Sequence, residues 1–250
     1  MIEVTRARDV MVIAHRGASS YAPENTLAAF DLALQMGVRH IELDVHATRD
    51  DHIVVIHDDN VERTTNGTGP VASHTLSALK ALDAGSWFAP RFAGERIPTL
   101  DDVFERYDGQ AHIHTEIKGH SGDLAKQTVE SIRRNGMAEQ VTITSFQRAR
   151  LEETRAYAPE LPTGWLVAAI TDAVIAQAQA MGLTQLCPRA DTVTPELVDR
   201  LRGAGFIVRA WGVTDEDLMR AVVKAGADGM TVNFPDKLIA YLKAPTQAST

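Results

Sequence analysis

Short runs of β-forming residues alternate with amphipathic helical segments along most of this chain of 250 residues. A strand pairs in parallel with the next strand when a helix joins them, because the helix carries the chain back to the same edge. We count eight such strand–helix units. The expected strands lie within residues 10–15, 40–47, 112–118, 140–146, 162–168, 182–188, 206–213 and 227–234. The alternation therefore predicts an α/β fold with a parallel sheet.

The number of units distinguishes two parallel architectures. Eight units in a chain of this length are typical of a (β/α)8 TIM barrel. An open doubly wound sheet is the alternative, but it usually has fewer strands and a glycine-rich first turn, and the sequence has neither feature. Thr194 before a proline and a glutamate indicates a helix N-cap, and Gly226 follows a helical segment. We predict a single catalytic barrel domain over residues 1–250.

The interval between the second and third expected barrel strands is longer than the later intervals. Residues 50–98 fill it, beginning with another apolar run, "HIVVIHDD", and continuing through a glycine-bearing turn, "TTNGTG". We interpret this small insertion as an extra strand plus a compact excursion over one end of the barrel, within the single domain.

Polar and apolar side chains alternate in the expected strands at 40–47 and 112–118. In a barrel the apolar face packs against the helices, so the polar face points to the centre, which branched apolar side chains normally fill. Glu42, Asp44 and Glu116 would then be buried carboxylates, and these are costly without a cation. They also lie late in their strands, where the active sites of barrel enzymes are found.

These three carboxylates predict an oxygen-rich metal site. Hard oxygen ligands favour Mg²⁺ or Ca²⁺, with Mn²⁺ as a further candidate, over zinc. Ion pairs with Arg16 and Lys118 are the alternative interpretation. His15 and His57 each end an apolar run near the carboxylates. A lone histidine there is more often structural, but two beside a carboxylate cluster suit a general acid and a general base.

Several motifs, met in the same order, resemble the glycerophosphodiester phosphodiesterase family of the phospholipase C-like phosphodiesterase superfamily. They are "AHRGAS…APENT", "IELDVH", "VVIHDD", "EIK" and "ADGM…NFP", and "RTTNGTG", "LDAGSWF" and "RFAGERIPTL" resemble the family's small excursion. Each motif alone is weak, but together they span residues 10–237 and are highly specific. The resemblance implies a distorted (β/α)8 barrel that cleaves glycerophosphodiesters to sn-glycerol 3-phosphate and an alcohol, with a divalent cation.

The resemblance also implies roles for individual residues. His15 and His57 match the acid/base pair of the family, and Glu42, Asp44 and Glu116 match its metal ligands. Arg16 and Lys118 match the groups that hold the phosphoryl oxygens. Trp211 matches a tryptophan near the glycerol side, and Asn25 matches an asparagine that supports the site. Three positions depart from the family pattern: Gly212, where threonine is usual, Asn233, where aspartate is common, and His114, where asparagine is frequent.

We hypothesise that the glycerol 2-hydroxyl loses its proton to one histidine and attacks phosphorus, which gives a cyclic phosphate that water then opens. Direct attack by water is the alternative route, and we prefer His15 as base and His57 as acid. Other functions stay open: a lyase-type phospholipase D that releases the cyclic phosphate, a non-catalytic phosphoester-binding barrel, and a metal-dependent amidohydrolase suggested by His112 and His114.

Composition narrows the choice of partners. The net charge of −8 and the absence of a basic block argue against nucleic acid or an anionic membrane as partner, but they do not exclude a small anionic substrate. The family resemblance implies that this substrate is a small-molecule glycerophosphodiester. No stretch approaches a membrane span and the first ten residues lack an apolar signal core, which predicts a cytoplasmic protein without stable membrane insertion. The one cysteine, Cys187, is expected in the core. The oligomeric state stays open, a homodimer included.

Overall fold

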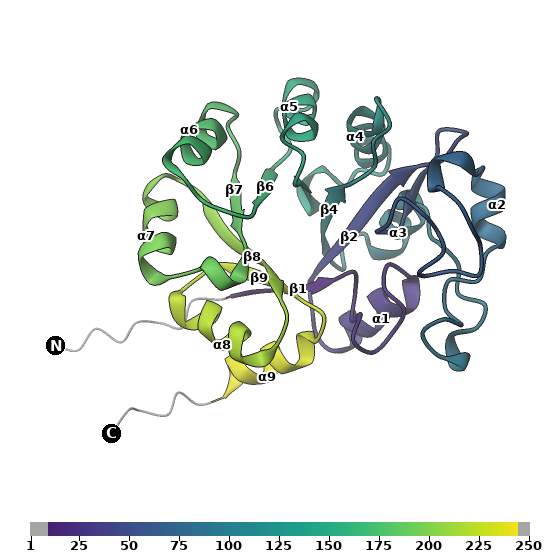
Figure 1. Ribbon diagram of the computed structural model, residues 1–250, viewed down its shortest axis with the longest axis horizontal. Coiled ribbons are helices and arrows are strands. Elements are labelled where there is room, and N and C mark those ends of the chain that lie inside the picture. The colour runs from purple at the N-terminus through teal and green to yellow at the C-terminus, as the bar shows by residue number, and fades with distance from the viewer. Residues whose placement is uncertain (1–9, 245–250) are drawn as a thin grey trace.

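Eight parallel strands form a closed ring in the computed structural model, which describes residues 10–244 (Figure 1). They are β1 (Met11–His15), β2 (His40–Ala47), β4 (His112–Ile117), β5 (Val141–Ser145), β6 (Thr163–Val167), β7 (Gln185–Pro188), β8 (Ile207–Val213) and β9 (Gly229–Val232). Strand β1 pairs with both β9 and β2, which closes the ring. The predicted (β/α)8 barrel is confirmed.

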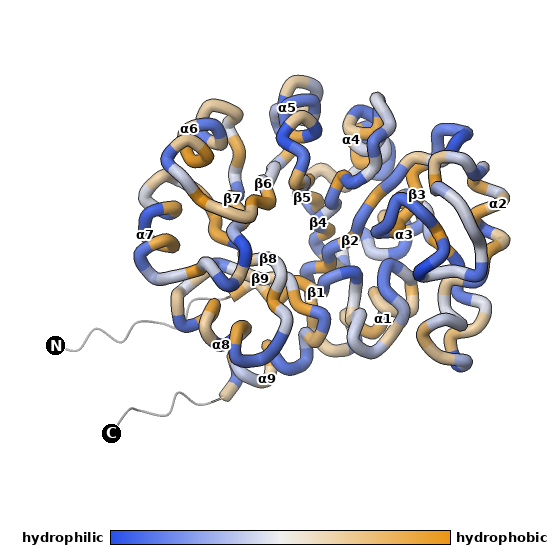
Figure 2. The backbone as a smooth tube through the Cα atoms, viewed as in Figure 1, coloured by the Kyte–Doolittle hydropathy of each residue, from blue (hydrophilic) through white to orange (hydrophobic). Residues whose placement is uncertain are grey.

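Helices surround this ring, with apolar segments turned toward the strands and polar segments outward (Figure 2). They are α1 (Leu27–Gln35), α3 (Leu100–Tyr107), α4 (Leu124–Arg134), α5 (Arg148–Tyr157), α6 (Asp172–Ala180), α7 (Pro195–Gly203), α8 (Glu216–Ala225) and α9 (Pro235–Lys243). The Thr194 side chain accepts a hydrogen bond from the Leu197 amide, and Gly226 ends α8 with φ of 83°, as their sequence contexts predict.

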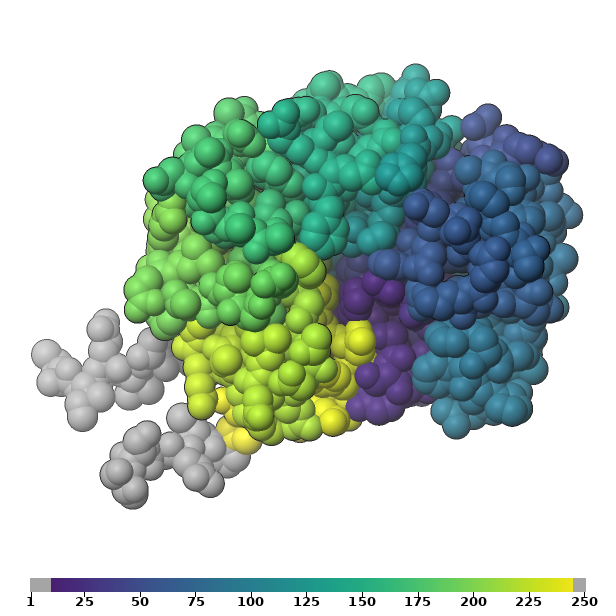
Figure 3. All heavy atoms as spheres, viewed as in Figure 1, coloured from purple at the N-terminus to yellow at the C-terminus, as the bar shows by residue number. Residues whose placement is uncertain are grey.

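Between β2 and α3 the chain makes an excursion that is visible as a lobe beside the barrel (Figure 3). It contains strand β3 (Ile53–Val55), antiparallel to β2, two short 3₁₀ turns, Val71–Ser73 and Pro90–Phe92, and helix α2 (Leu76–Ala81). Val54, Val61 and Leu79 belong to a small apolar core of its own. Because the lobe follows the carboxyl end of β2, it brings its loops to the end of the barrel where the predicted site lies.

The interior of the barrel is unusually polar. Buried side chains of His114, Thr144, Gln185 and Arg209 lie among the strands, where branched apolar residues are usual. The apolar residues pack outward against the helices in two main clusters, one around β2, β4 and β5 and one around β6 to β9. Cys187 is buried as predicted. Within residues 10–244, every helix is too short or too polar to cross a bilayer.

Candidate active site

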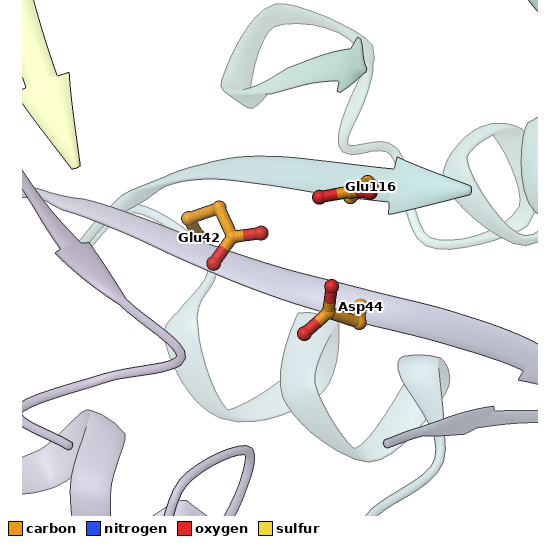
Figure 4. A group of neighbouring side chains, drawn as sticks. All are labelled: Glu42, Asp44 and Glu116. Atoms are coloured by element: carbon orange, nitrogen blue, oxygen red, sulfur yellow. The ribbon is translucent and has the colours of Figure 1, made fainter. Parts of the chain in front are cut away.

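Three carboxylates from neighbouring strands converge at the carboxyl end of the barrel (Figure 4). Asp44 on β2 lies directly opposite Glu116 on β4 in the strand register, and Glu42 precedes Asp44 by two residues on the same face. Oxygen atoms of the three groups lie within 4.8 Å of one another, and all three side chains are buried. The strand alternation thus brings together the residues that the sequence predicts as metal ligands.

Nearby cations only partly compensate the negative charge of this cluster. Burial, followed by the charges of Asp44 and Glu116, raises the pKa of Glu42 well above its usual range. Burial and the charge of Asp44 likewise raise the pKa of Glu116 to about 7, although Lys118 opposes the shift. The Oδ1 atom of Asp44 is buried and has no hydrogen-bond partner among the described residues. An all-oxygen donor set with an orphaned oxygen fits a hard divalent cation.

Arg16 and Asn25 hold Asp44 from the other side. The Arg16 Nε atom lies 3.1 Å from Asp44 Oδ2, and Asn25 Nδ2 donates to the same oxygen at 2.9 Å. Arg16 has a φ of 57° and is followed by Gly17 at 83°. A Cβ atom at Gly17 would lie 2.6 Å from the backbone of Ala29, so only glycine allows this turn. The turn explains how His15 at the end of strand β1 and Arg16 directly after it both come close to the carboxylates.

His15 and His57 are 42 residues apart in the sequence but line the same cavity. The Nδ1 atom of His15 lies 2.7 Å from the amide oxygen of Asn233, so this nitrogen carries the proton and Nε2 is free, 3.9 Å from Glu42 Oε2. Burial and the neighbouring Arg16 lower the pKa of His15. His15 is therefore a neutral imidazole with its free nitrogen toward the carboxylates.

His57 has a different partner. Its Nδ1 atom lies 2.6 Å from a carboxylate oxygen of Asp58, so it faces an anion where His15 faces a neutral amide. Burial lowers the pKa of His57, and the charges of Arg16 and Lys118 add to that shift, whereas the charge of Asp44 and the hydrogen bond with Asp58 oppose it. Asp58 is in turn bound by Arg63, which also donates to Glu24 at 2.8 Å. This ion-pair chain joins the excursion to the loop after β1.

Two hollows meet at this site. The inner cavity, of about 340 Å³, is lined from the first half of the chain by His15, Arg16, Glu42, His57, Glu116 and Lys118, and from the second half by Phe146, Leu166, Arg209, Trp211, Gly212 and Thr231. The outer groove, of about 630 Å³, shares His57, Glu116, Lys118 and Phe146 with it and extends over the excursion past Asp59. Of the carboxylate cluster, Glu116 therefore lines both hollows, whereas Glu42 lines the inner cavity.

Sequence comparisons show which family has this fold. The sequence profile of the "Glycerophosphoryl diester phosphodiesterase family" matches residues 15–237. The chain belongs to this family. A glycerophosphodiester phosphodiesterase of Caldanaerobacter subterraneus is 40% identical over 234 residues, which cover 92% of this chain and 96% of that protein. One of Bacillus subtilis is 32% identical over 248 residues, covering 91% and 84% respectively.

Solved structures of this family share the fold. A phosphodiesterase of Oleispira antarctica in complex with the product sn-glycerol 3-phosphate superposes with a TM-score of 0.88 at 31% identity, covering 93% of this chain and 96% of that one. A glycerophosphodiester phosphodiesterase of Agrobacterium tumefaciens has a TM-score of 0.83 at 33% identity and covers 92% and 99%. The predicted membership in the glycerophosphodiester phosphodiesterase family is confirmed.

The three departures from the family pattern have different surroundings in the structure. Asn233 holds His15, and His114 lies deep in the barrel with its Nε2 atom 3.3 Å from Nδ1 of His40. Gly212 has a φ of 74° and lies in a bulge of β8 beside Trp211. The Trp211 indole donates to the Val167 carbonyl, and its ring packs edge-on against Phe146.

Sequence reasoning missed several groups that the structure places at the site. They are Glu24, Asp58, Arg63, Phe146 and Arg209. Arg209 precedes Trp211 by two residues in a strand, so the period of two could have placed both on one face. No comparable signal joins Glu24 to Arg63, because 39 residues separate them in the chain.

Proposed function

We propose that this protein hydrolyses glycerophosphodiesters to sn-glycerol 3-phosphate and an alcohol, with a divalent cation and two histidines as acid and base. One observation carries the proposal: His15 and His57 line the same cavity as Glu42 and Glu116, two members of the carboxylate cluster. A phosphodiester is an anion, so a protein with net charge −8 needs local positive charge to hold it.

Glu42, Asp44 and Glu116 would hold the divalent cation, with Mg²⁺ and Ca²⁺ favoured by the oxygen ligands. When bound, this ion supplies Lewis-acid stabilisation of the charge on the phosphoryl oxygens. Arg16 and Lys118 both line the inner cavity and would bind the same oxygens from the protein side.

The partners of the two histidines support different roles. His15, held by the neutral Asn233 amide, is disposed to accept a proton through its free Nε2 atom. His57, beside the Asp58 carboxylate, is stabilised more as the imidazolium that donates a proton. We propose that His15 takes the proton of the glycerol 2-hydroxyl as this oxygen attacks phosphorus. His57 protonates the departing alcohol, and water opens the cyclic phosphate with the two roles reversed.

A coupled assay for sn-glycerol 3-phosphate, run on several glycerophosphodiesters with and without a chelator, tests this function. We expect turnover that chelation abolishes and that added Mg²⁺ or Ca²⁺ restores. Phosphorus NMR of the products distinguishes hydrolysis from a lyase reaction, because a lyase accumulates the cyclic phosphate. Turnover of substrates that lack the 2-hydroxyl at the normal rate would contradict the cyclic route. If none of the diesters is turned over although metal is bound, the proposed phosphodiesterase activity is refuted.

A further inference from the structure

His46 is a buried histidine at the mouth of the barrel to which the proposed chemistry gives no role. It follows Asp44 by two residues on β2, so it lies on the same face of the strand as the proposed metal ligands. The residue is 4% exposed and lines the outer groove together with His57. Because a buried imidazole normally has a hydrogen-bond partner, the group that it binds indicates what it does.

The partner of His46 is the backbone of His57. The Nε2 atom of His46 lies 3.0 Å from the His57 carbonyl oxygen. A carbonyl only accepts hydrogen bonds, so Nε2 carries a proton and donates it to this oxygen. The other ring nitrogen, Nδ1, lies 3.7 Å from Asp59 Oδ1, which is beyond hydrogen-bond distance. Within residues 10–244, the bond to His57 is therefore the only hydrogen bond of the His46 side chain.

The carbonyl that His46 binds lies where the chain leaves the barrel for the excursion. Strand β3 pairs with β2 as far as Val55, and the Ile56 amide still donates to the Asp44 carbonyl at 3.0 Å. In the described part of the chain, no backbone amide donates to the His57 carbonyl. The backbone hydrogen bonds to β2 have thus ended at this point, and the His46 side chain continues the attachment of the excursion to the strand.

The segment after β4 holds the His46 ring in place. A Cβ atom at Gly119 would lie 3.3 Å from Nδ1 of His46 and 2.8 Å from a methyl carbon of Leu124, so this segment packs closely over the imidazole. The Gly119 amide donates to the Val45 carbonyl at 3.2 Å, which fixes that packing. The ring therefore has little room to turn away from the His57 carbonyl.

We propose that His46 is a positioning residue for the proposed acid, because its hydrogen bond sets where His57 lies relative to the metal ligands of β2. This inference rests on the proposed function. His57 follows β3, whereas Glu42 and Asp44 are on β2, so their separation depends on how this segment is attached to β2. The contact of His57 with Asp58, its neighbour in the chain, orients the ring without attaching it to β2. A displacement of about 1 Å in a catalytic group can cost about 100-fold in rate.

Release of the leaving group from two esters of sn-glycerol 3-phosphate tests this role on the full-length chain, with the divalent cation that supports turnover. The ethanolamine ester has a poor leaving group that needs a proton from His57. The p-nitrophenyl ester releases a stable phenolate that needs none. Single turnovers with enzyme in excess report the first step alone. Displacement of His57 should therefore slow release of ethanolamine selectively.

His46→Asn and His46→Gln are matched in polarity but differ in reach. The asparagine amide ends near the position of Nδ1, whereas the glutamine amide extends to that of Nε2 and can still donate to the carbonyl. We expect His46→Asn to slow release of ethanolamine by about tenfold or more and release of nitrophenolate by less than about threefold. His46→Gln should recover most of the loss.

Two further variants calibrate the comparison. His57→Ala removes the proposed acid itself and should show the same selectivity between the esters, more strongly. His74→Asn is the matched control, because His74 in the excursion also contacts a backbone carbonyl through Nε2, that of Thr68 at 2.9 Å. It should leave both rates unchanged. Circular dichroism and thermal melting establish folding, and His46→Leu takes the place of His46→Asn if the latter does not fold.

Equal slowing of both esters by His46→Asn would overturn the proposal, because His46 would then support the site as a whole and not the acid. Unchanged release of ethanolamine would overturn it too, as would a His46→Gln variant as slow as His46→Asn. His57→Ala separates this inference from the proposed function. If it slows both esters equally, the acid role of His57 fails. If it slows only the ethanolamine ester and His46→Asn slows neither, the role of His46 alone is refuted.

Discussion

The two halves of the barrel bring different chemistry to the inner cavity. Strands β1, β2 and β4 and the excursion contribute charged and titratable groups, which are His15, Arg16, Glu42, His57, Glu116 and Lys118. Strands β6, β8 and β9 and the residues after β5 contribute Phe146, Leu166, Trp211 and Thr231, with Arg209 as their one charge. The groups that the proposed reaction uses therefore lie in the first half, and the second half supplies most of the apolar wall.

The two halves also differ in how they are stabilised. In the first half, the ion-pair chain from Arg16 through Glu24 and Arg63 to Asp58 offsets charges that would otherwise repel, but the carboxylate cluster stays under-compensated. In the second half, Trp211 is held by a backbone carbonyl and an aromatic edge contact. Loss of a charge in the first half should therefore cost activity, whereas changes in the second half should alter affinity.

Among these predictions, we expect Glu116→Gln in the first half of the barrel to have the largest effect on activity. It removes one negative charge from the proposed metal site while keeping the shape of the side chain, so cation affinity should fall steeply. We expect a loss of kcat on the order of 1,000-fold, with calorimetry showing weaker Mg²⁺ binding. Glu105→Gln on α3 is the control and should leave both unchanged. Retention of more than a tenth of wild-type activity would show that the cluster does not hold an essential ion.

Exchanging the partners of the two histidines should shift opposite limbs of the pH–activity profile. Asn233→Asp places a carboxylate on His15, raises its pKa and moves the acidic limb of kcat/KM to higher pH, because the base must lose its proton. Asp58→Asn removes a carboxylate from His57, lowers its pKa and moves the alkaline limb to lower pH. We expect rate changes of about tenfold on the shifted limbs. If Asn233→Asp moves the alkaline limb instead, the two roles are reversed.

Trp211→Ala should produce a smaller effect, confined to binding. The ring forms part of the apolar wall and contacts Phe146, so its removal exposes the cavity to water without touching the acid or the base. We expect KM for a glycerophosphodiester to rise by about five- to tenfold with kcat changed less than about twofold. Steady-state kinetics of Trp211→Ala beside Trp87→Ala, in the excursion, test this. A fall in kcat alone would place Trp211 with the reacting groups.

The smallest effect concerns stability without the cation. The pKa of Glu116 is raised to about 7 in the folded state, against an ordinary value of 4.5, so its contribution to the free energy of unfolding is present below pH 4.5 and is lost as the pH rises through 7. In the presence of chelator, the melting temperature of Glu116→Gln should therefore exceed that of wild type. We expect this difference to increase from pH 5 to pH 8 and to reach about 5 °C. Thermal melts at both values measure it. A margin that narrows with pH would contradict the raised pKa.

Much of the fold and part of the site followed from local patterns. The alternation of strands and helices predicted the barrel, since each strand–helix unit imposes the same parallel crossover. The period of two within β2 and β4 placed Glu42, Asp44 and Glu116 on the interior face, because side-chain direction along a strand depends only on position. Order and spacing of the motifs indicated the family. These properties are local in the chain, and the sequence by itself determined them.

Other properties were decided by the tertiary structure alone. Asn233 meets His15 across 218 residues, and Arg63 meets Glu24 across 39, because strand pairing and loop paths bring them together. The unpaired donors of Arg209 and the orphaned Asp44 oxygen are likewise invisible in the sequence, since a missing partner becomes evident only when every neighbour is placed. Burial and pairing depend on contacts between distant segments, and these contacts exist only in the closed barrel.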